Sequence, residues 1–410
     1  TLPAGGGILV VPGAEDEPLH ALFESSMVSG PARTAVVTAE ESVSYGELDV
    51  RANALAWHLR VACGVGPESL VGLCVERSIG MLVGMLGIMK AGGAYVPLDP
   101  EAPVVRTFAC VLDCEPFAVI AGAVSRDSFE REKIVLKIIG TDGRLRGVMT
   151  NSTSPTTFLQ LPVVAQTACY TIYTSGSTGT PKGVLIDHKN ARTYATAIAQ
   201  MWSLKGSERW LCTQSFIFDS TITSIWGSFA TGATLLLPTK DELLSAPDDV
   251  VREYAATHVK LTPSLLSLFE PGFHRVHLQA LVVGGEALAS SLLEAWTEIE
   301  SAPWFINHYG PTEATVGCTS DNLTAHLIAH PRSIGKPFPG TGGFVVSCSG
   351  ESTEMCVPAE LCINGPQVAR GYMNRGKMTA IQFRNAGLAA CRTYRTGDLC
   401  RWLPDGTLEF

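Results

Sequence analysis

Helical and strand-like patterns alternate along most of this chain. Apolar residues recur with the period of an amphipathic helix in some segments, and short apolar runs separate those segments. The first 187 residues predict helices that start at 19–24 and extend over 45–61 and 79–91, and strands at 34–38, 70–75, 94–97, 118–121, 133–139 and 168–173. Such alternation predicts parallel sheets with helices packed on their faces.

The alternation continues after a glycine-rich run and then changes character. A second α/β half extends to about residue 283, with predicted helices at 188–203 and 219–230 and strands at 209–213 and 233–237. From residue 333 the apolar runs are short and broken by Gly, Pro and Ser, as at 343–347 and 361–364, which is typical of a β-rich unit. We expect an α/β fold with subdomains at 1–187 and 188–332, a cleft between them, and a β-rich subdomain at 333–410.

Composition narrows the class of protein. At 410 residues the chain exceeds the roughly 250 to 300 residues at which a single core stops growing, so several subdomains are expected. A hydrophobic content of 46% supports large cores, and no low-complexity tract indicates disorder. The net charge of −9 argues against a nucleic-acid partner, because phosphate backbones require clustered Lys and Arg.

The cysteines and the apolar stretches indicate the compartment. The 12 cysteines form no CxxC pair and no Cys/His cluster, which favours buried free thiols in a reducing cytosol. The amino terminus lacks the basic and apolar regions of a signal peptide, and no 18-residue apolar stretch occurs. We expect a soluble, cytoplasmic protein with no membrane partner.

Residues 173–183, Tyr-Thr-Ser-Gly-Ser-Thr-Gly-Thr-Pro-Lys-Gly, are the main candidate for chemistry. Glycine lets the backbone approach an anion closely, hydroxyl groups donate hydrogen bonds, and Lys182 supplies positive charge. A strand-like segment precedes the run, so the run should leave the edge of a sheet, where doubly wound folds bind ligands. The sequence therefore predicts a phosphate-binding loop here.

Two other interpretations of this run are weaker. A flexible Ser/Gly linker would have neither the strand before it nor the Pro-Lys-Gly-Val sequence at its end. A Walker A loop requires Gly directly before its Lys, and here that position is Pro181. The run resembles instead the signature loop of the adenylate-forming superfamily, whose members activate a carboxylate with ATP.

Further blocks resemble the amino-acid adenylation domains of nonribosomal peptide synthetases. They stand in the order usual for that family and extend over essentially the whole chain. The blocks are Val-Ser-Tyr-Gly-Glu-Leu at 43–48, Met-Lys-Ala-Gly-Gly-Ala-Tyr-Val-Pro-Leu-Asp at 89–99, the run 173–183, Phe-Asp-Ser at 218–220, Asn-His-Tyr-Gly-Pro-Thr-Glu at 307–313, 359–365 with 368–372, and Tyr-Arg-Thr-Gly-Asp-Leu at 394–399. The resemblance implies the large amino-terminal core of these enzymes, with two α/β subdomains, a cleft between them and a small distorted β-barrel.

The resemblance also implies a reaction and its partners. An amino acid would attack the α-phosphate of ATP, and the resulting aminoacyl group would pass to the pantetheine thiol of a peptidyl carrier protein, beside neighbouring synthetase domains. Such catalysis is chiefly positioning and charge neutralisation. The catalytic positions fall on Thr174, Lys182, Thr312 and Glu313. In the family the residue matching Glu313 binds Mg²⁺, a cation that prefers oxygen ligands; a solvated surface Glu is the alternative.

Contacts to the nucleoside come from the same resemblance. It assigns adenine stacking to Tyr309, the adenine amino edge to Asn307, and the ribose hydroxyls to Asp398, and core packing is the alternative for Tyr309. Phe410 falls where many relatives place a second aromatic ring against the base. The expected ATP-binding set is Thr174, Ser175, Gly176, Ser177, Thr178, Gly179, Lys182, Asn307, Tyr309, Thr312, Asp398 and Phe410.

The same blocks place an amino-acid pocket. Its expected lining is Asp219, Ser220, Thr223, Lys260, Val282, Gly284, His308, Val316 and Gly317. In the family the residue matching Asp219 pairs with the substrate α-ammonium. A buried, unpaired Lys260 would be costly, so a substrate carboxylate is its natural partner, with His308 as a second donor. Thr223 adds a hydroxyl, and Gly284 and Gly317 are expected to leave space.

This set resembles the pocket of aspartate-activating domains, apart from Ser220, where those domains usually have an aliphatic residue, and Val316, which replaces Ile. L-aspartate or a β-substituted aspartate is therefore the expected substrate, with asparagine or another amino acid as the alternative. A Lys260 that extends to solvent would recognise nothing.

Two other functions are alternatives to amino-acid adenylation. An acyl-CoA or aryl-acid ligase would have apolar groups in place of Asp219 and Lys260, and a noncatalytic nucleotide-binding module is the second rival.

A structural role in seating helices and turns is expected for Tyr45, Lys90 and the run 370–372. Family members continue with a lid of roughly 100 residues that carries a catalytic Lys. Since the printed sequence ends at Phe410, we expect substrate binding with weak adenylation.

Overall fold

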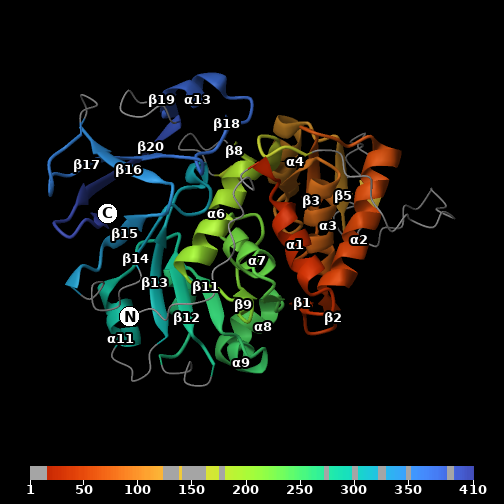
Figure 1. Cartoon of the computed structure of the whole chain (residues 1–410), viewed down its shortest axis with the longest axis horizontal. Helices are drawn as coiled ribbons and strands as arrows, with labels where there is room; N and C mark the ends of the chain where they lie inside the picture. The colour runs from red at the N-terminus through yellow and green to blue at the C-terminus, as the bar shows by residue number, and fades with distance from the viewer. Residues whose placement is uncertain are drawn as a thin grey trace.

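The computed structural model describes residues 16–122, 138–140, 163–174, 181–271, 277–297, 303–321, 329–347, 352–385 and 392–410. Within them the chain forms two sheets, with helices packed between the sheets and on their outer faces (Figure 1). The α/β alternation predicted for both halves is confirmed, and most predicted elements lie close to their expected positions. Of the predicted strand 133–139, the structure has β6 at Ile138–Gly140, and 133–137 lie outside the described residues.

The smaller sheet has seven strands and belongs mainly to the first half. Across the sheet they are β18 (Gly371–Tyr372), β8 (Lys182–Asp187), β7 (Ala168–Thr174), β4 (Ala94–Pro97), β3 (Leu70–Cys74), β5 (Ala118–Ala121) and β6. Pairing is parallel from β7 to β6, whereas β8 is antiparallel to both β7 and β18. The glycine-rich run thus connects two adjacent antiparallel strands, β7 and β8.

The larger sheet has fourteen strands and contains the site region. In order they are β16 (Gly342–Val346), β17 (Ala359–Asn364), β20 (Arg392–Trp402), β21 (Leu408–Glu409), β15 (Ser333–Pro337), β14 (Thr319–Asp321), β13 (Trp304–Tyr309), β12 (Ala280–Gly284), β11 (His258–Leu261), β9 (Arg209–Cys212), β10 (Thr234–Leu236), β1 (Thr34–Val37) and β2 (Ser42–Ser44), with β19 (Phe383–Asn385) paired to β20. The strands from β13 to β1 are parallel.

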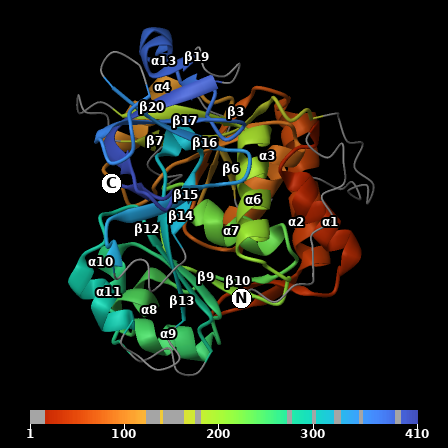
Figure 2. The same cartoon turned by 60° about the vertical axis from the view of Figure 1, so that its left-hand side comes forward.

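Strand pairing crosses two of the expected subdomain boundaries. Strands β1 and β2 come from the first range but extend the large sheet, and β18 comes from the last range but joins the small sheet. The β-rich strands from residue 333 onward continue the large sheet by antiparallel pairing instead of forming a separate one. Figure 2 shows these strands near one end of α6. The three ranges stay a prediction about subdomains.

Helices flank both sheets, and local sequence explains where several begin. They are α1 (His20–Ser29), α2 (Tyr45–His58), α3 (Ile79–Lys90), α4 (Val104–Cys114), α6 (His188–Met201), α7 (Thr221–Phe229), α8 (Lys240–Ser245), α9 (Pro247–Glu253), α10 (Pro263–Leu266), α11 (Ser290–Thr297) and α13 (Gly376–Gln382). Ser44 caps α2 by accepting from the Glu47 amide, while the Glu47 carboxylate accepts from the Ser44 amide at 2.8 Å. A cap of this kind stabilises a helix by about 1 kcal/mol.

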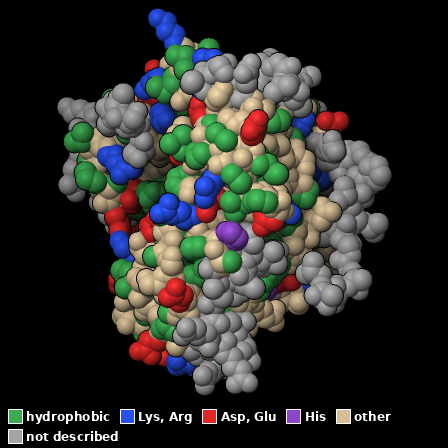
Figure 3. Space-filling view, turned by 90° about the vertical axis from the view of Figure 1, so that its left-hand side faces the viewer, with side chains coloured by type: hydrophobic (Ala, Val, Ile, Leu, Met, Phe, Trp, Pro, Cys, Tyr) green, Lys and Arg blue, Asp and Glu red, His purple; other side chains and the backbone are tan. Residues whose placement is uncertain are grey.

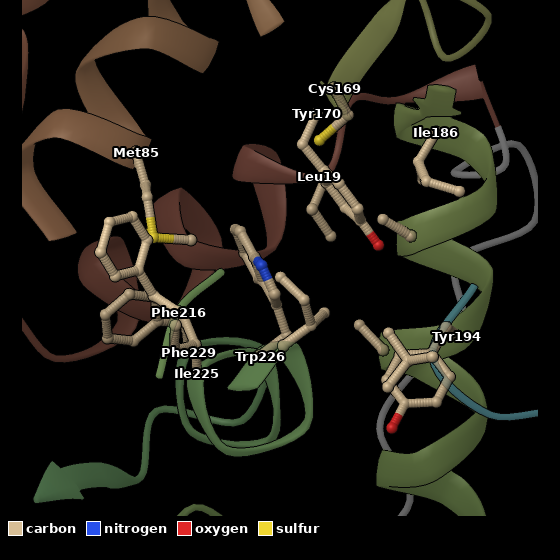
Figure 4. Packing of buried hydrophobic residues seen from close by; sticks show 14 of the residues in the cluster. Leu19, Met85, Cys169, Tyr170, Ile186, Tyr194, Phe216, Ile225, Trp226 and Phe229 are labelled. Atoms are coloured by element: carbon tan, nitrogen blue, oxygen red, sulfur yellow. The ribbon is translucent and has the colours of Figure 1, made fainter. Parts of the chain in front are cut away.

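The main core lies where α6 and α7 pack between the two sheets. Buried side chains from α3, β7, α6 and α7 meet there, including Met85, Tyr170, Tyr194 and Trp226 (Figure 4). A second core covers the opposite face of the large sheet, under α9 and α11. Residues that alternate along β11, β12 and β13 therefore point to different cores, and Val282 and Ile306 belong to the one shared with α6 and α7.

The surface agrees with the composition. On the face drawn in Figure 3, Lys and Arg side chains are interspersed with Asp, Glu and apolar groups, so no basic face is seen there. Among the described residues, no helix combines the length and the apolar character that crossing a bilayer would require.

Candidate active site

The loop that follows β13 carries the acid predicted to hold a metal. Loop 310–318 includes a turn of 3₁₀ helix, η4 (Thr312–Ala314), which places Glu313 at the end of the sheet. A Cβ atom added to Gly310 would lie only 2.4 Å from the Cα atom of Gly317. The two arms of the loop therefore approach too closely for any side chain at that position.

The connection between β17 and β18 fastens this loop. Thr315 donates through Oγ1 to the carbonyl of Gln367 at 2.5 Å, and Gln367 Nε2 donates to the carbonyl of Gly317 at 2.9 Å. The amide of Ala369 donates to the carbonyl of Glu313 at 2.9 Å. Gln367 is fully buried, so these bonds form away from solvent and fix the loop from one side.

Val316 occupies a strained conformation at the centre of a three-residue turn. The amide of Gly317 donates to the carbonyl of Thr315 at 2.8 Å, and Val316 has a φ of 70°. A β-branched residue in the left-handed region typically costs about 1 to 3 kcal/mol. The Gln367 contacts supply the restraint that such a conformation requires.

Glu313, Lys182 and Tyr372 form a compact group, which we call the Glu313 cluster. Tyr372 donates through its hydroxyl to Glu313 Oε1 at 2.6 Å, and Lys182 Nζ lies 3.4 Å from the same oxygen. The Lys182 ammonium also lies 4.6 Å from the centre of the Tyr372 ring. Burial, followed by the charge of Glu313, raises the pKa of Tyr372, so its hydroxyl stays a donor. Glu313 is 5% exposed, so it is not a solvated surface acid.

The glycine-rich run is described only at its ends. Thr174 closes β7, and its hydroxyl is buried with no hydrogen-bond partner among the described residues. Lys182 opens β8 and points to Glu313. The remaining predicted positions, Ser175, Gly176, Ser177, Thr178 and Gly179, lie outside the described residues. The run therefore contributes one orphaned hydroxyl and one ammonium to the described geometry.

The residues predicted to contact the nucleoside lie together. Tyr309 donates through its hydroxyl to Asp398 Oδ2 at 2.5 Å, and its ring centre lies 5.9 Å from that of Phe410. Asn307 is buried and donates through Nδ2 to the carbonyl of Ser333 at 2.7 Å. That bond fixes the amide so that Oδ1 remains the acceptor. The geometry thus brings together two rings, a carboxylate and an oriented amide.

Asp219 stands at the start of α7 with an incomplete set of partners. Its Oδ2 is buried and has no hydrogen-bond partner among the described residues. Burial raises the pKa of this carboxyl, whereas a hydrogen bond from Thr312 and the charge of Lys260 act in the opposite direction. An added cation at Oδ2 would favour the ionised form.

Lys260 begins a chain of hydrogen bonds that we call the Lys260 network: Lys260, His308, Tyr194 and Thr223. Lys260 Nζ and His308 Nδ1 are 2.5 Å apart, Tyr194 Oη and His308 Nε2 are 3.3 Å apart, and Tyr194 Oη and Thr223 Oγ1 are 2.6 Å apart. All four side chains are buried. Burial lowers the pKa of Lys260 to about 7, although the negative charge of Asp219 raises it.

One alternative and one expectation about this region are corrected. The alternative in which Lys260 extends to solvent does not hold, since it is 3% exposed and its amine bonds to a ring nitrogen. His308 does not offer a free second donor, because both its ring nitrogens are in hydrogen bonds within the protein. Burial, and then the charge of Lys260, lower the pKa of His308 well below its usual range, so the ring is neutral.

Gly284 and Gly317 also differ from expectation, because His308 fills the space beside them. A Cβ atom added to Gly284 would lie 1.9 Å from the His308 carbonyl oxygen, and one added to Gly317 would lie 1.9 Å from His308 Nε2. Gly284 therefore leaves room for the main chain of residue 308, and Gly317 leaves room for the His308 ring. Val282 is fully buried beside Lys260 in the sheet register, and Ser220 directly precedes α7.

Sequence reasoning missed the contacts of three residues. Tyr372 was expected to be scaffold but contacts Glu313, and Tyr194 and Gln367 were not considered. Only Tyr372 gave a signal, since it lies in a block shared with the resembled family. Tyr45 and Lys90 are scaffold as expected: Tyr45 donates to two backbone carbonyls, and Lys90 bonds two buried or half-buried acids.

Comparison with known proteins agrees with this geometry. The family model described as AMP-binding enzyme matches residues 23–373. One component of the linear gramicidin synthase of Brevibacillus parabrevis is 37% identical over 399 residues, which are 96% of this chain and 8% of that protein. Nonribosomal peptide synthetase 7 of Aspergillus fumigatus is 34% identical over 399 residues, 95% of this chain and 16% of that protein.

A solved structure gives the same result for the fold. The nonribosomal peptide synthetase FmoA3 superposes with a TM-score of 0.84 at 25% identity, over 96% of this chain and 42% of that one. Fold and family match together define an ATP-dependent ligase of the adenylate-forming type. The chain belongs to the family of AMP-binding enzymes. It spans less than a tenth of the gramicidin synthase component.

Proposed function

We propose that this chain activates an α-amino acid with ATP, giving an aminoacyl adenylate and pyrophosphate. A carboxylate oxygen of the amino acid forms a bond to the α-phosphorus, and the bond from that phosphorus to the bridging oxygen of the β-phosphate breaks. Family membership and the Glu313 cluster beside the Tyr309–Asp398 pair support this reaction. The glycine-rich run 173–183 offers an ammonium and hydroxyl groups to the phosphates, which suits a reaction controlled by charge neutralisation.

The Glu313 cluster fits the polyphosphate end. Lys182 is neutralised by Glu313 within the protein, and a triphosphate would compete for that ammonium. Glu313 would then hold Mg²⁺, a fit supported by a single buried carboxylate, because protein-bound Mg²⁺ takes one or two carboxylates together with phosphate oxygens. The ion would neutralise charge on the departing pyrophosphate. Tyr372 keeps the carboxylate oriented through its hydroxyl.

The nucleoside would bind where Tyr309, Phe410, Asp398 and Asn307 meet. The two rings offer aromatic faces for adenine, and Asn307 Oδ1 accepts from an exocyclic amine. Asp398 accepts from ribose hydroxyls, which would replace or share its bond with the Tyr309 hydroxyl. Thr174 and Thr312 complete the ATP-binding side.

The substrate assignment rests on one observation: the buried oxygen Oδ2 of Asp219 and the buried ammonium of Lys260 lack ion-pair partners among the described residues. Asp219 Oδ2 has no partner, and the described contacts of Lys260 Nζ consist of the neutral His308 ring. An amino acid with a side-chain carboxylate supplies both missing charges, its α-ammonium to Asp219 and its carboxylate to Lys260. We therefore propose L-aspartate or a β-substituted aspartate, with Ser220, Thr223, Val282 and Val316 around it.

Two other substrate classes are less compatible with these groups. Asparagine could accept a hydrogen bond from Lys260 but would leave the buried ammonium without a counter-charge. An aryl or fatty acid would leave both Asp219 and Lys260 unpaired. A noncatalytic nucleotide-binding module would bind ATP without amino-acid-dependent chemistry.

The acceptor of the activated amino acid is proposed from the relatives. This chain matches a small part of synthetases that are many times longer. We propose that a pantetheinylated carrier protein and neighbouring synthetase domains receive the aminoacyl group. The proposed compartment is the cytoplasm.

The test is amino-acid-dependent exchange of pyrophosphate into ATP with a panel of twenty amino acids. Aspartate should give the highest rate, and calorimetry should detect binding of a nonhydrolysable aspartyl-adenylate mimic. Nucleotide binding without any exchange would favour the noncatalytic module. A preference for an apolar or aryl acid would overturn the substrate assignment.

A further inference from the structure

Tyr194 is a buried residue of α6 whose hydroxyl lies between the two ends of the Lys260 network. It contacts His308 Nε2 at 3.3 Å and Thr223 Oγ1 at 2.6 Å. Its ring packs 6.0 Å from the His308 ring and 6.1 Å from Phe338, so it is held by the core on both sides. The position of this hydroxyl is therefore fixed by packing and is independent of any ligand.

A charged Lys260 fixes the direction of every bond in the network. A charged ammonium has donors only, so His308 Nδ1 must accept, and the neutral ring then carries its proton on Nε2. Nε2–H donates to Tyr194, and Tyr194 donates to Thr223. The Thr223 hydroxyl then keeps its own proton free to donate. Burial raises the pKa of Tyr194, so the phenol stays protonated.

Loss of the Lys260 proton permits the reverse order. A neutral amine gains a lone pair that can accept from Nδ1–H; Nε2 then accepts from Tyr194, and Thr223 donates to the phenol oxygen. Charged Lys260 and a donating Thr223 suit the oxygens of a carboxylate. Neutral Lys260 and an accepting Thr223 suit the amide group of a carboxamide.

We propose that Tyr194 is a positioning residue of the amino-acid site: its hydroxyl stabilises the His308 tautomer that supports a charged Lys260 and links that charge to the direction of the Thr223 hydroxyl. This inference rests on the proposed function for its substrate. It extends the specificity-determining set beyond the positions predicted from sequence.

The groups around the network limit how Lys260 can titrate. Asp219 from the start of α7 is the charged group acting on Lys260, and it favours the ammonium. His308 of β13 and Cys212, the register neighbour on β9, are the titratable groups beside it. Burial raises the pKa of Cys212, so it stays a neutral thiol.

The test compares Tyr194→Phe with Tyr45→Phe. Both remove one buried phenol oxygen with two hydrogen bonds, but Tyr45 bonds only backbone carbonyls of Ser228 and Ala233. In exchange assays, Tyr194→Phe should lower the ratio of kcat/KM for aspartate over asparagine by roughly tenfold. Tyr45→Phe should leave the ratio unchanged. An unchanged ratio in Tyr194→Phe would overturn the inference.

A second readout needs no substrate. Nitrogen-15 NMR of labelled histidine, with His308 assigned by the change in Lys260→Met, should show Nε2 protonated in the wild type at pH 6. Carbon-13 titration of lysine should show a lower Lys260 midpoint in Tyr194→Phe, since the supporting tautomer has lost its acceptor. Identical tautomer and midpoint in both proteins would refute the role of Tyr194. Failure of amino-acid-dependent exchange in the wild type would instead refute the proposed function, and the NMR result would still decide this inference.

Discussion

The two ends of the candidate site differ in whether their charged groups are paired within the protein. At the polyphosphate end, Lys182, Glu313 and Tyr372 neutralise one another within the protein. At the amino-acid end, Asp219 Oδ2 and Lys260 are buried, and the described residues give neither an ion-pair partner. At the polyphosphate end the charges are paired within the protein, so the contact between Lys182 and Glu313 must loosen when ATP binds. At the amino-acid end the charges are unpaired, so a ligand with matching charges adds ion pairs without breaking any.

This contrast indicates where stability and recognition conflict. Breaking a paired buried charge usually destabilises a protein, whereas replacing an unpaired one by an apolar residue often stabilises it. Substitutions at the two ends should therefore change the free energy of unfolding in opposite directions, even when both impair activity. Five experiments test that contrast.

The largest effect is expected at the paired end. Glu313→Gln removes the carboxylate proposed to hold Mg²⁺ and leaves Lys182 without its counter-charge. It should lower kcat/KM for ATP by about 100- to 1,000-fold in pyrophosphate exchange. Glu101→Gln is the control, since it breaks an exposed ion pair with Lys240. Activity of Glu313→Gln equal to that of the control would contradict the assignment.

Lys260→Met tests the unpaired end. It should reduce the preference for aspartate over asparagine by about 100-fold, because the charged partner is lost. It should also raise the free energy of unfolding by about 1 to 4 kcal/mol in denaturant titration. Lys182→Met, at the paired end, should give no such gain. Equal stability changes in the two variants would remove the contrast.

Proton linkage predicts how those effects depend on pH. Lys260 has a pKa of about 7 when folded and the ordinary lysine value when unfolded, so the unfolded chain binds more protons between those values. Wild-type stability therefore rises with pH above 7, and the gain from Lys260→Met is largest near pH 6.

The selectivity should follow the same group. The ratio of kcat/KM for aspartate over asparagine should fall about tenfold as pH rises from 6 to 8, since kcat/KM reports the free enzyme. The control is Lys260→Met, whose ratio should not vary with pH. A flat wild-type ratio over this range would show that Lys260 does not control the preference.

The smallest effect is expected at Tyr372. Tyr372→Phe removes the hydrogen bond that orients Glu313 but keeps the ring beneath Lys182. The KM for ATP should rise by about fivefold, with little change in stability. Tyr45→Phe again serves as the comparison. A KM equal to that of the control would return Tyr372 to a scaffold role.

Much of the fold could be predicted because periodicity and caps act locally. The helix at 45–58 has its cap, apolar stripe and glycine stop within its own sequence, and the strands at 70–74 and 94–97 are short apolar runs between turns. Strand partners could not be read in this way. Nothing local in the segment 371–372 indicates that it joins a sheet formed mainly by residues before 187.

The site followed the same division. Asp219 and Glu313 could be selected because they stand in blocks shared with the resembled family, and Lys260 because a single charge on an apolar strand is visible in a sequence. Tyr194 could not, since one aromatic residue on the buried face of a helix looks like core until its hydroxyl partner is known. The glycines at 284 and 317 were given the wrong neighbour for the same reason: open space cannot be inferred without knowing which side chain occupies it.

The close approach of His308 to those two glycines has a consequence for altering specificity. A library that varies position 317 alone would sample residues whose first side-chain atom collides with the ring of His308, so a larger residue there becomes acceptable only when residue 308 shrinks in the same step. Position 284 faces the backbone carbonyl of residue 308, which no substitution at 308 removes. Substrate exchange by single substitutions is therefore expected to proceed through positions 220, 223 and 260, and natural variants at 317 should carry a change at 308.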